Sequence, residues 1–367
     1  MKLLAVIGTR PEAIKMAPLL AALREERGVE LRLCVTGQHR EMLDSPLRSF
    51  GLEADCDLAL MEEQQSLNAL AGSCLLAMDR IFDAARPDYV LVHGDTTTAL
   101  ATALAAFHRG LRVGHVEAGL RSGDLERPFP EEMNRRAIDM VSDLLFAPTL
   151  AAKRNLQAER ARGRIFVTGN TGIDALQLAL TRKGPGDELP PLDPARKLVL
   201  VTGHRRESFG EGLASICSAL AELARRDDVE ILYPVHLNPA VRGPVEAALG
   251  DRPNIRLVAP LDHRPLVRLM QRADLILTDS GGIQEEAPSL GTPVLVMREV
   301  TERPEGIAAG FARLVGTDRE RIVREAAAVL DGTTGFAEGP NPYGDGRAAE
   351  RIVAALLGRQ FEEFQGP

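Results

Sequence analysis

Short apolar segments alternate with longer amphipathic segments along almost the whole of this 367-residue chain. In the first half, five apolar runs are typical of buried strands: Leu3–Ile7, Leu31–Thr36, Tyr89–His93, Val113–Glu117 and Leu144–Ala147. Helical patterns lie between them, for example at Ala13–Glu26 and Thr98–Arg109. Strands that alternate with helices predict a parallel sheet covered on both faces, so we expect an α/β protein.

The same alternation restarts after a segment rich in glycine and proline, residues 184–191, which is typical of a linker or a long loop. Five further runs predict a second parallel sheet: Lys197–Thr202, Glu230–Val235, Ile255–Val258, Leu275–Thr278 and Val294–Met297. Arg347–Phe364 predicts a closing helix. No short internal repeat is present.

A chain of this length exceeds one ordinary hydrophobic core, so we expect two doubly wound, Rossmann-like domains. We expect residues 1–170 to form the first and residues 171–349 to form the second. Residues 350–367 are expected to pack back on the first domain. Two such domains that face each other place ligands at the carboxyl ends of both sets of strands, in the cleft between them.

Composition and charge exclude several classes of protein. No apolar run is long enough to span a bilayer, and the amino terminus lacks a signal-peptide pattern, so we expect a cytoplasmic protein. The net charge is −8 and no block of Lys and Arg appears, which argues against a nucleic-acid partner. The four cysteines lack CxxC spacing and the seven histidines lack metal-ligand spacing, so we expect no metal site.

An apolar run, Leu275–Thr278, leads into Asp279-Ser280-Gly281-Gly282 and then into a helical pattern that contains Glu286. Glycines allow a ligand to approach the backbone closely, and free N–H groups at a helix start bind phosphate. A plain strand-to-helix turn capped by Ser280 explains the pattern equally well. If the turn binds a nucleotide, Glu286 is placed to accept hydrogen bonds from ribose hydroxyls.

A second candidate, residues 8–15, follows the first strand. Its Arg10 has the planar fork that binds a diphosphate, and Pro11 is suited to start a helix. For Lys15 alone, a solvated charge on a capped helix is the better interpretation.

Carboxylates follow three other predicted elements. Asp95 and Glu117 each come just past a strand, whereas Glu131 and Glu132 lie at a helix start, where acids are common because of the helix dipole. Carboxylates that converge at strand ends repel one another, which raises some pKa values into the range useful for acid–base chemistry. His204 takes the equivalent strand-end position in the second domain, directly before Arg205 and Arg206.

Long motifs in this chain resemble those of the non-hydrolysing UDP-N-acetylglucosamine 2-epimerases, in order and over essentially the whole sequence. The matching segments are GTRPEAIKMAPL (Gly8–Leu19), GQHREML (Gly37–Leu43), HGDTTTA (His93–Ala99), GHVEAGLRS (Gly114–Ser122), PFPEEMNR (Pro128–Arg135), VTGHRRE (Val201–Glu207), TDSGGIQEEAPSLGTP (Thr278–Pro293), Arg298–Glu305 and NPYGDG (Asn341–Gly346).

This resemblance implies a GT-B fold, a homodimer, no metal or nicotinamide cofactor, and a place in cell-surface polysaccharide biosynthesis. It implies that UDP-N-acetylglucosamine and UDP-N-acetylmannosamine are the ligands. Four residues would be catalytic: Asp95, Glu117, Glu131 and His204. Seven would hold the UDP-sugar: Arg10, Lys15, Ser280, Gly281, Gly282, Glu286 and Arg303. By the same resemblance an allosteric site for a second UDP-N-acetylglucosamine includes Gln38, Glu131, Arg205 and His236, with Glu41 in place of a family Gln.

The chemistry of such a reaction has its own logic. The C2 hydrogen of the sugar is not next to a carbonyl, and the chain carries no GxGxxG fingerprint for oxidation by a nicotinamide. Elimination of UDP to 2-acetamidoglucal, followed by re-addition, needs carboxylates at C2 and positive groups at the diphosphate. Which carboxylate serves which face of C2 stays open.

Other activities remain alternatives: epimerisation of a related sugar such as UDP-2,3-diacetamido-glucuronate, a hydrolysing epimerase that releases N-acetylmannosamine, and glycosyl transfer. A non-catalytic sensor of nucleotide sugars would keep Arg10 and the Ser-Gly-Gly turn. It would have no need of the cleft carboxylates, and glycosyl transfer needs fewer of them. Residues Gln38-His39-x-x-Met42 favour the non-hydrolysing branch.

Overall fold

The computed structural model describes residues 1–37, 47, 50–60, 65–181, 188–203 and 209–366. The chain separates into two compact units. The first unit comprises residues 1–178 and 343–366, and the second comprises residues 179–342.

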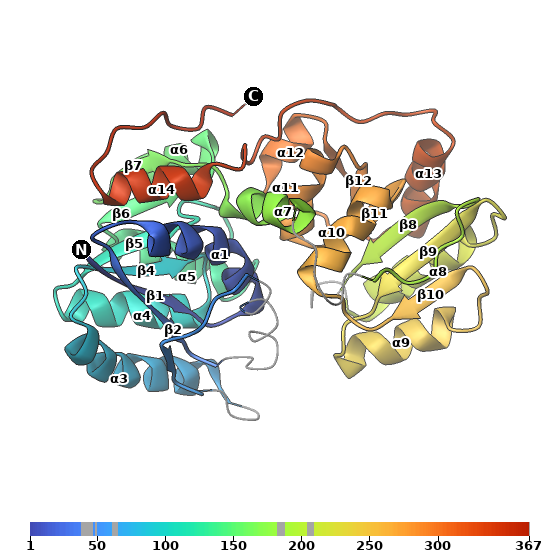
Figure 1. Ribbon diagram of the computed structural model, residues 1–367. Helices are drawn as coiled ribbons and strands as arrows, with labels where there is room; N and C mark the ends of the chain where they lie inside the picture. The colour runs from blue at the N-terminus through green and yellow to red at the C-terminus, as the bar shows by residue number, and fades with distance from the viewer. Residues whose placement is uncertain (38–46, 48–49, 61–64, 182–187, 204–208, 367) are drawn as a thin grey trace. The chain divides into compact units, whose positions relative to one another are not determined.

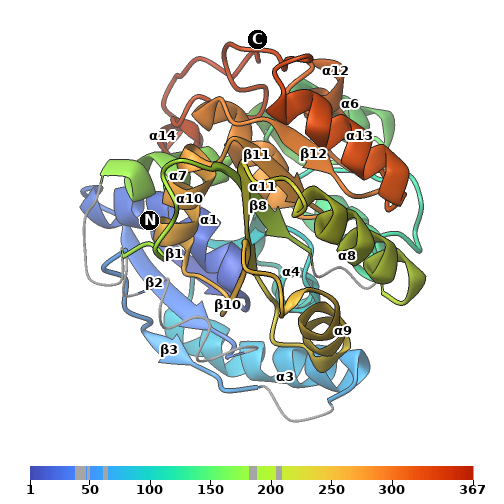
Figure 2. The same cartoon turned by 90° about the vertical axis from the view of Figure 1, so that its right-hand side faces the viewer.

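The first unit is built on a seven-stranded, wholly parallel sheet of order β3-β2-β1-β4-β5-β6-β7 (Figures 1 and 2). Its strands are β1 (Lys2–Ile7), β2 (Glu30–Val35), β3 (Cys56–Asp57), β4 (Tyr89–His93), β5 (Arg112–Val116), β6 (Leu144–Ala147) and β7 (Arg164–Val167). Strand order reverses between β1 and β4, and ligands of doubly wound sheets bind at the carboxyl ends of the strands beside such a switch point.

Helices cover both faces of this sheet: α1 (Arg10–Glu25), α3 (Leu67–Ala85), α4 (Thr97–His108), α5 (Glu131–Val141), α6 (Leu150–Ala158), the beginning of α7 (Thr171–Thr181) and α14 (Ala348–Leu356). Alternate residues of β1 point to opposite faces. Leu3 and Ile7 pack in a core with α1 and α14, which lie side by side in Figure 1. Leu4 and Val6 pack with α3 and α4 on the other face.

The second unit repeats this plan with a six-stranded parallel sheet of order β10-β9-β8-β11-β12-β13. Its strands are β8 (Lys197–Thr202), β9 (Val229–Pro234), β10 (Ile255–Val258), β11 (Leu275–Thr278), β12 (Val294–Val296) and β13 (Ala312–Leu314). The helical elements are α8 (Glu211–Leu223), α9 (Pro239–Leu249), α10 (His263–Arg272), α11 (Gly281–Glu286), η2 (Ala287–Leu290), α12 (Pro304–Ala308) and α13 (Arg319–Leu330). The prediction of an α/β protein with two doubly wound parallel sheets is confirmed.

The closing helix is shorter than the predicted Arg347–Phe364. Helix α14 ends at Leu356, and Gly358 follows with a φ of +67°. A glycine in the left-handed region commonly terminates a helix, because other residues are strained there. Asp174 accepts hydrogen bonds from the first two backbone N–H groups of α14, at 3.2 and 2.8 Å, and so fixes where the helix begins.

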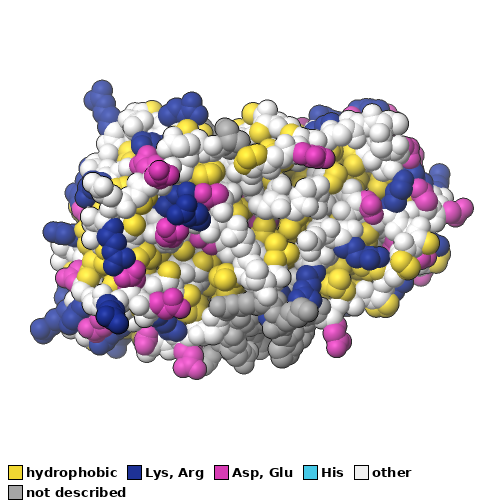
Figure 3. Space-filling view, turned by 45° about the horizontal axis from the view of Figure 1, so that its top comes forward, with side chains coloured by type: hydrophobic (Ala, Val, Ile, Leu, Met, Phe, Trp, Pro, Cys, Tyr) yellow, Lys and Arg dark blue, Asp and Glu magenta, His cyan; other side chains and the backbone are white. Residues whose placement is uncertain are grey.

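None of the helices in the described part of the chain combines the length and the apolar character that a membrane span requires. On the face drawn in Figure 3, Lys and Arg side chains are interspersed with Asp and Glu side chains.

Candidate active site

A buried carboxylate, Glu12, organises the loop between β1 and α1. Its side chain is 3% exposed and accepts hydrogen bonds from the backbone N–H groups of Gly8 and Thr9, at 2.7 and 2.6 Å. It also accepts from the Thr96 hydroxyl at 2.7 Å, which joins this loop to the turn after β4. Burial raises the pKa of Glu12. Arg10, the first residue of α1, therefore starts from a fixed loop at the switch point of the sheet.

Lys15 and Glu117 form a buried ion pair. Lys15 projects from α1, Glu117 follows β5, and the amide of Asn170 donates a second hydrogen bond to the Glu117 carboxylate at 3.1 Å. His93, at the end of β4, lies with Nε2 3.9 Å from the same carboxylate. Burial lowers the pKa of His93 to about 4, although the Glu117 charge opposes the shift. The structure thus brings two predicted site residues together beside a neutral imidazole.

Glu117 adopts an unusual backbone conformation, with a φ of +68°. Residues other than glycine, asparagine and aspartate rarely adopt this left-handed backbone conformation, and when they do the surrounding structure must hold them in it. Gly119, two residues on, has a φ of +85° and packs so closely that a Cβ atom would lie 2.5 Å from the Ala152 carbonyl oxygen. Strain of this kind is typical of functional sites.

Asp95 lies in the turn between β4 and α4, and its side chain is 26% exposed. Arg135 donates to its carboxylate at 2.5 Å, and the Asn134 amide donates to its backbone carbonyl at 2.8 Å. Both partners come from α5, whose first residue is Glu131. The turn of Asp95 and the start of α5 are therefore joined. Glu132 is fully buried and accepts from the backbone N–H of Ser122 at 2.9 Å, which is a structural role.

In the second unit, β11 leads through Asp279 and Ser280 into α11. The turn begins at the switch point between β8 and β11, where the Thr202 and Thr278 hydroxyls are 2.6 Å apart. A Cβ atom on Gly281 would lie 2.4 Å from Cζ of Arg303, so only glycine leaves room for that guanidinium. A Cβ atom on Gly282 would meet open space, because the nearest atom to it would be the Ser280 hydroxyl oxygen at 3.9 Å.

Arg303 lies in a buried charge network. Its Nε donates to Glu285 at 2.7 Å and its Nη1 to Glu302 at 2.5 Å, and Glu302 also accepts from Arg298 at 2.8 Å. Glu286, one residue beyond Glu285, lies 3.3 Å from Nε2 of His263. The predicted Ser280, Gly281, Gly282, Glu286 and Arg303 are thus gathered around one strand end of the second unit.

The comparisons with known proteins agree with one another. The family model described as UDP-N-acetylglucosamine 2-epimerase matches residues 21–357. The UDP-N-acetylglucosamine 2-epimerase of Escherichia coli K12 is 52% identical over 97% of this chain and 98% of its own length. This chain belongs to the UDP-N-acetylglucosamine 2-epimerase family.

Solved structures of the family have the same fold. The UDP-GlcNAc 2-epimerase of Neisseria meningitidis, bound to UDP-GlcNAc, matches with a TM-score of 0.94 and 44% identity, over 98% of this chain and 100% of that one. An S. aureus co-structure with UDP matches with a TM-score of 0.90 and 41% identity, over 100% of this chain and 99% of that one. The expected family, and with it the class of isomerase, is confirmed.

Four predicted site residues of this family member lie outside the described residues: Gln38, Glu41, His204 and Arg205. His236 is described. It is exposed, and its Nδ1 accepts from the backbone N–H of Asn238 at 3.1 Å.

Sequence reasoning overlooked several polar residues that surround the predicted ones in this epimerase-family chain. Glu12 and His93 stand inside the quoted motifs, so their motif context was the available clue. Asn170 comes shortly after β7, and its place after a strand is the feature of the sequence that could have indicated a site residue. Glu285 and Glu302, which pair with Arg303, also lie inside quoted motifs, and no spacing rule connects them.

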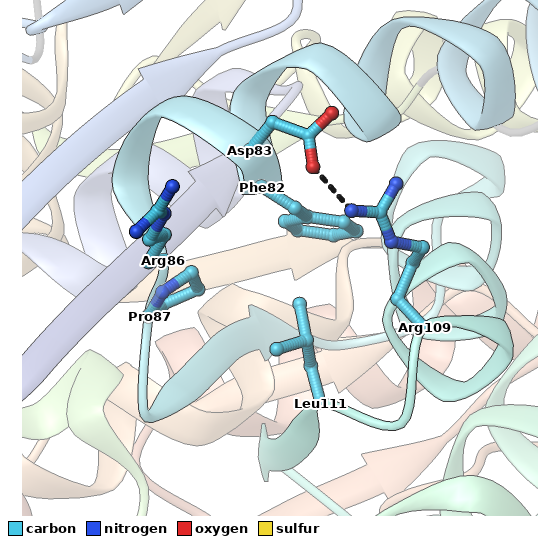
Figure 4. Close-up of a pocket in the computed structure, with 6 residues that line it drawn as sticks. All are labelled: Phe82, Asp83, Arg86, Pro87, Arg109 and Leu111. Carbon is cyan, nitrogen blue, oxygen red and sulfur yellow. Dashed lines mark hydrogen bonds and ion pairs between the residues drawn. The ribbon is translucent and has the colours of Figure 1, made fainter.

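A separate pocket of about 370 Å³ lies in the first unit, among the end of α3, the turn before β4 and the turn before β5 (Figure 4). It is lined by Phe82, Asp83, Arg86, Pro87, Arg109 and Leu111. Arg109 pairs there with Asp83 and, at 2.9 Å, with Asp79. This pocket is at the amino ends of the strands, opposite to the edge where epimerase-family motifs converge, and it contains none of the predicted site residues.

Proposed function

We propose that this protein catalyses the reversible epimerisation of UDP-N-acetylglucosamine and UDP-N-acetylmannosamine at C2. The observation that carries the proposal is the match, over nearly its whole length, to the E. coli UDP-N-acetylglucosamine 2-epimerase. The Neisseria meningitidis relative that is bound to UDP-GlcNAc supports the same ligand class.

The reaction proceeds by elimination and re-addition. UDP leaves from C1 while a base removes the C2 proton, which gives 2-acetamidoglucal. Delivery of a proton to the opposite face of C2, with return of UDP to C1, inverts the centre. The redox state of the sugar is the same at both ends, so no electron acceptor is consumed. The route requires acid–base groups at C2 and stabilisation of the departing diphosphate.

Residues of the first unit supply the acid–base groups. Glu117 and Asp95 follow neighbouring strands, and Glu131 begins the helix that holds the Asp95 turn. Lys15 and Asn170 fix the Glu117 carboxylate, while neutral His93 beside it adds no second positive charge. A carboxylate that is fixed in one rotamer is suited to proton transfer at a single carbon. His204 remains part of the proposed catalytic set.

Residues of the second unit bind the UDP group. The backbone N–H of Ser280 donates to the Thr278 hydroxyl at 2.9 Å, so Gly281 and Gly282 supply the N–H groups for the phosphates, and the Arg303 guanidinium lies against Gly281, where it adds positive charge. Glu286 is assigned to the ribose hydroxyls. Arg10 and Lys15 of the first unit complete the proposed substrate-binding set.

An NMR experiment in deuterated water tests this function. The protein is incubated with UDP-N-acetylglucosamine, and both sugar nucleotides are followed. Deuterium at C2 of both epimers, with UDP still attached, is the expected result. Free N-acetylmannosamine would instead indicate a hydrolysing enzyme, and no turnover would direct the search to diacetamido sugars.

Three further properties belong to this proposal: a homodimer, action in the cytoplasm, and activation by UDP-N-acetylglucosamine at a second site that includes His236. Light scattering after gel filtration tests the dimer. Initial rates with pure UDP-N-acetylmannosamine test the activation, since a trace of added epimer is expected to raise them. Unchanged hyperbolic kinetics would count against the second site.

A further inference from the structure

His115 lies in the middle of β5, is fully buried, and has a hydrogen-bond partner at each ring nitrogen. Nε2 is 2.7 Å from the backbone carbonyl oxygen of Gly94, and Nδ1 is 2.7 Å from Oδ1 of Asp139 on α5. The proposed chemistry makes no use of either side chain. Buried histidine–carboxylate pairs are costly unless they are fully satisfied, so this arrangement calls for a physical explanation.

The partners determine where the protons are. A carbonyl oxygen only accepts, so Nε2 must carry a hydrogen. The contact between Nδ1 and Asp139 needs a second hydrogen. The other oxygen of Asp139 accepts from the backbone N–H of Gly119 at 3.2 Å and from Arg121 at 2.8 Å. His115 therefore donates from Nε2 to the Gly94 carbonyl, and one further proton joins Nδ1 to Asp139.

The two ends of this pair reach the two turns that carry the proposed acid–base residues. Gly94, whose carbonyl His115 binds, immediately precedes Asp95 and has a φ of +63°. Gly119, whose N–H Asp139 binds, ends the turn that begins at Glu117. Between them, the Gly94 N–H donates to the Val116 carbonyl at 3.0 Å. One buried pair thus contacts both turns.

We propose that His115 and Asp139 are positioning residues, which set the separation of the Asp95 turn from the Glu117 turn so that both carboxylates address the same sugar carbon. The inference rests on the proposed function for the identity of that carbon. It concerns the geometry of the first unit and not the binding of UDP.

The charges around the pair are consistent with this role. Arg121 lies on the far side of Asp139 and also pairs with Glu159 at 2.6 Å. Burial is the main cause of the lowered pKa of nearby His93, and Lys15 and then His115 contribute in the same direction, which helps to keep the His93 imidazole neutral. Asp139 thus contacts His115 with one oxygen and accepts from the Gly119 turn and Arg121 with the other, so its substitution by a neutral residue should disturb both turns.

The test compares Asp139→Asn with a matched control, Glu159→Gln. Both variants remove a carboxylate partner of Arg121, but only the first touches His115. For Asp139→Asn we expect kcat to fall by about 10- to 100-fold, because a misplacement of ~1 Å costs up to about a hundredfold. KM and the Kd for UDP should stay within about threefold, and Glu159→Gln should match the wild type.

A second measurement does not depend on turnover. In ¹⁵N-histidine NMR spectra of the full-length protein, Nε2 of His115 should be protonated in the wild type and in Asp139→Asn, and the Nδ1 signal should shift when the carboxylate is replaced. His115→Gln, which keeps a donor for the Gly94 carbonyl, should retain more kcat than His115→Leu.

Several results would overturn the inference. An unchanged kcat in Asp139→Asn is one, and equal losses of kcat and UDP affinity in both His115 variants is another. Unfolding of Asp139→Asn and His115→Gln alike would reduce the pair to a stabilising role. If the wild type fails to epimerise the substrate, the proposed function fails, and the NMR spectra still decide where the protons lie.

Discussion

Two turns at strand ends, one in each unit, differ in what fixes them: side chains in the first unit and glycine-rich backbone in the second. In the first unit, the turn after β5 carries a strained Glu117 and is fixed by side chains: Lys15, Asn170, and the His115–Asp139 pair nearby. In the second unit, the turn after β11 is a Ser-Gly-Gly backbone that enters a helix at once, and Arg303 packs on Gly281.

The difference between the two turns shows what proton transfer and phosphate binding each require of the protein. Proton transfer needs one carboxylate in one position, and only several converging side chains fix a carboxylate that well. Phosphate binding needs N–H groups and space, which glycine backbone supplies without any side chain. Under the proposed function, the first unit therefore carries most of the acid–base residues, and the second carries most of the residues that bind UDP.

The largest expected effect comes from Glu117→Gln. If this carboxylate transfers a proton at C2, kcat should fall by about 10²- to 10⁴-fold, while the Kd for UDP changes little. Steady-state rates and calorimetry with UDP measure the two quantities. Because the substitution leaves Lys15 buried without a carboxylate, the double variant Lys15→Met/Glu117→Gln controls for lost stability. Turnover close to that of the wild type would remove Glu117 from the chemistry.

The reverse pattern is expected from Gly281→Ala in the second unit. Its new Cβ atom would meet Cζ of Arg303 at 2.4 Å, so the guanidinium must leave its place. If Arg303 makes the proposed contact to the diphosphate, its loss should weaken UDP binding by about 2 kcal/mol, or roughly 30-fold. Gly282→Ala, where the space is open, is the matched control. Equal effects of the two alanines would mean that Arg303 does not contact UDP.

The third expected effect is a loss of stability in acid, caused by His93 in the first unit. His93 has a pKa of about 4 in the folded protein because it is buried, against ~6.5 when unfolded. The unfolded chain binds the proton more tightly, so this contribution is complete above pH ~6.5 and is lost as the pH falls toward 4. Between pH 7.5 and pH 5 the loss should be about 2 kcal/mol of unfolding free energy.

Urea denaturation at the two pH values measures this loss, with His93→Gln as the comparison. The variant lacks the titrating ring, so its stability should fall less on acidification. Parallel losses in the two proteins would show that His93 is not the group responsible.

The sequence predicted the strands well where an apolar run is bounded by polar residues. The predicted bounds of β4, β6, β8, β10 and β11 match the structure. The overlooked strands β3, β7 and β13 have at most four residues, and such short segments carry too little pattern to separate a strand from a loop. The pattern predicts too long a closing helix because Gly358, which ends the helix with a φ of +67°, lies inside an otherwise helical pattern.

The candidate site divides in the same way. Residues at strand ends, such as Asp95 and Glu117, are found from local pattern because parallel strands end at one edge. Their partners are not, because contacts such as Asn170 to Glu117 join residues 53 positions apart. Periodic patterns relate only residues that are close in the sequence, so the folded structure is needed to find such a contact.

The smallest expected effect is that of Glu286→Gln, which tests whether the second unit reads the ribose as well as the phosphates. Glu286 already lies 3.3 Å from His263, so part of its hydrogen-bonding capacity is used within the protein. The amide keeps one acceptor, and binding of UDP should weaken by only about 1 kcal/mol, roughly fivefold. Calorimetry with UDP and with 2′-deoxy-UDP isolates the ribose contribution. The wild type should prefer UDP, and the variant should lose part of that preference, because an amide oxygen accepts from the 2′-hydroxyl more weakly than a carboxylate does. An equal loss of affinity for both nucleotides would instead place Glu286 behind the phosphate turn, as a support for α11.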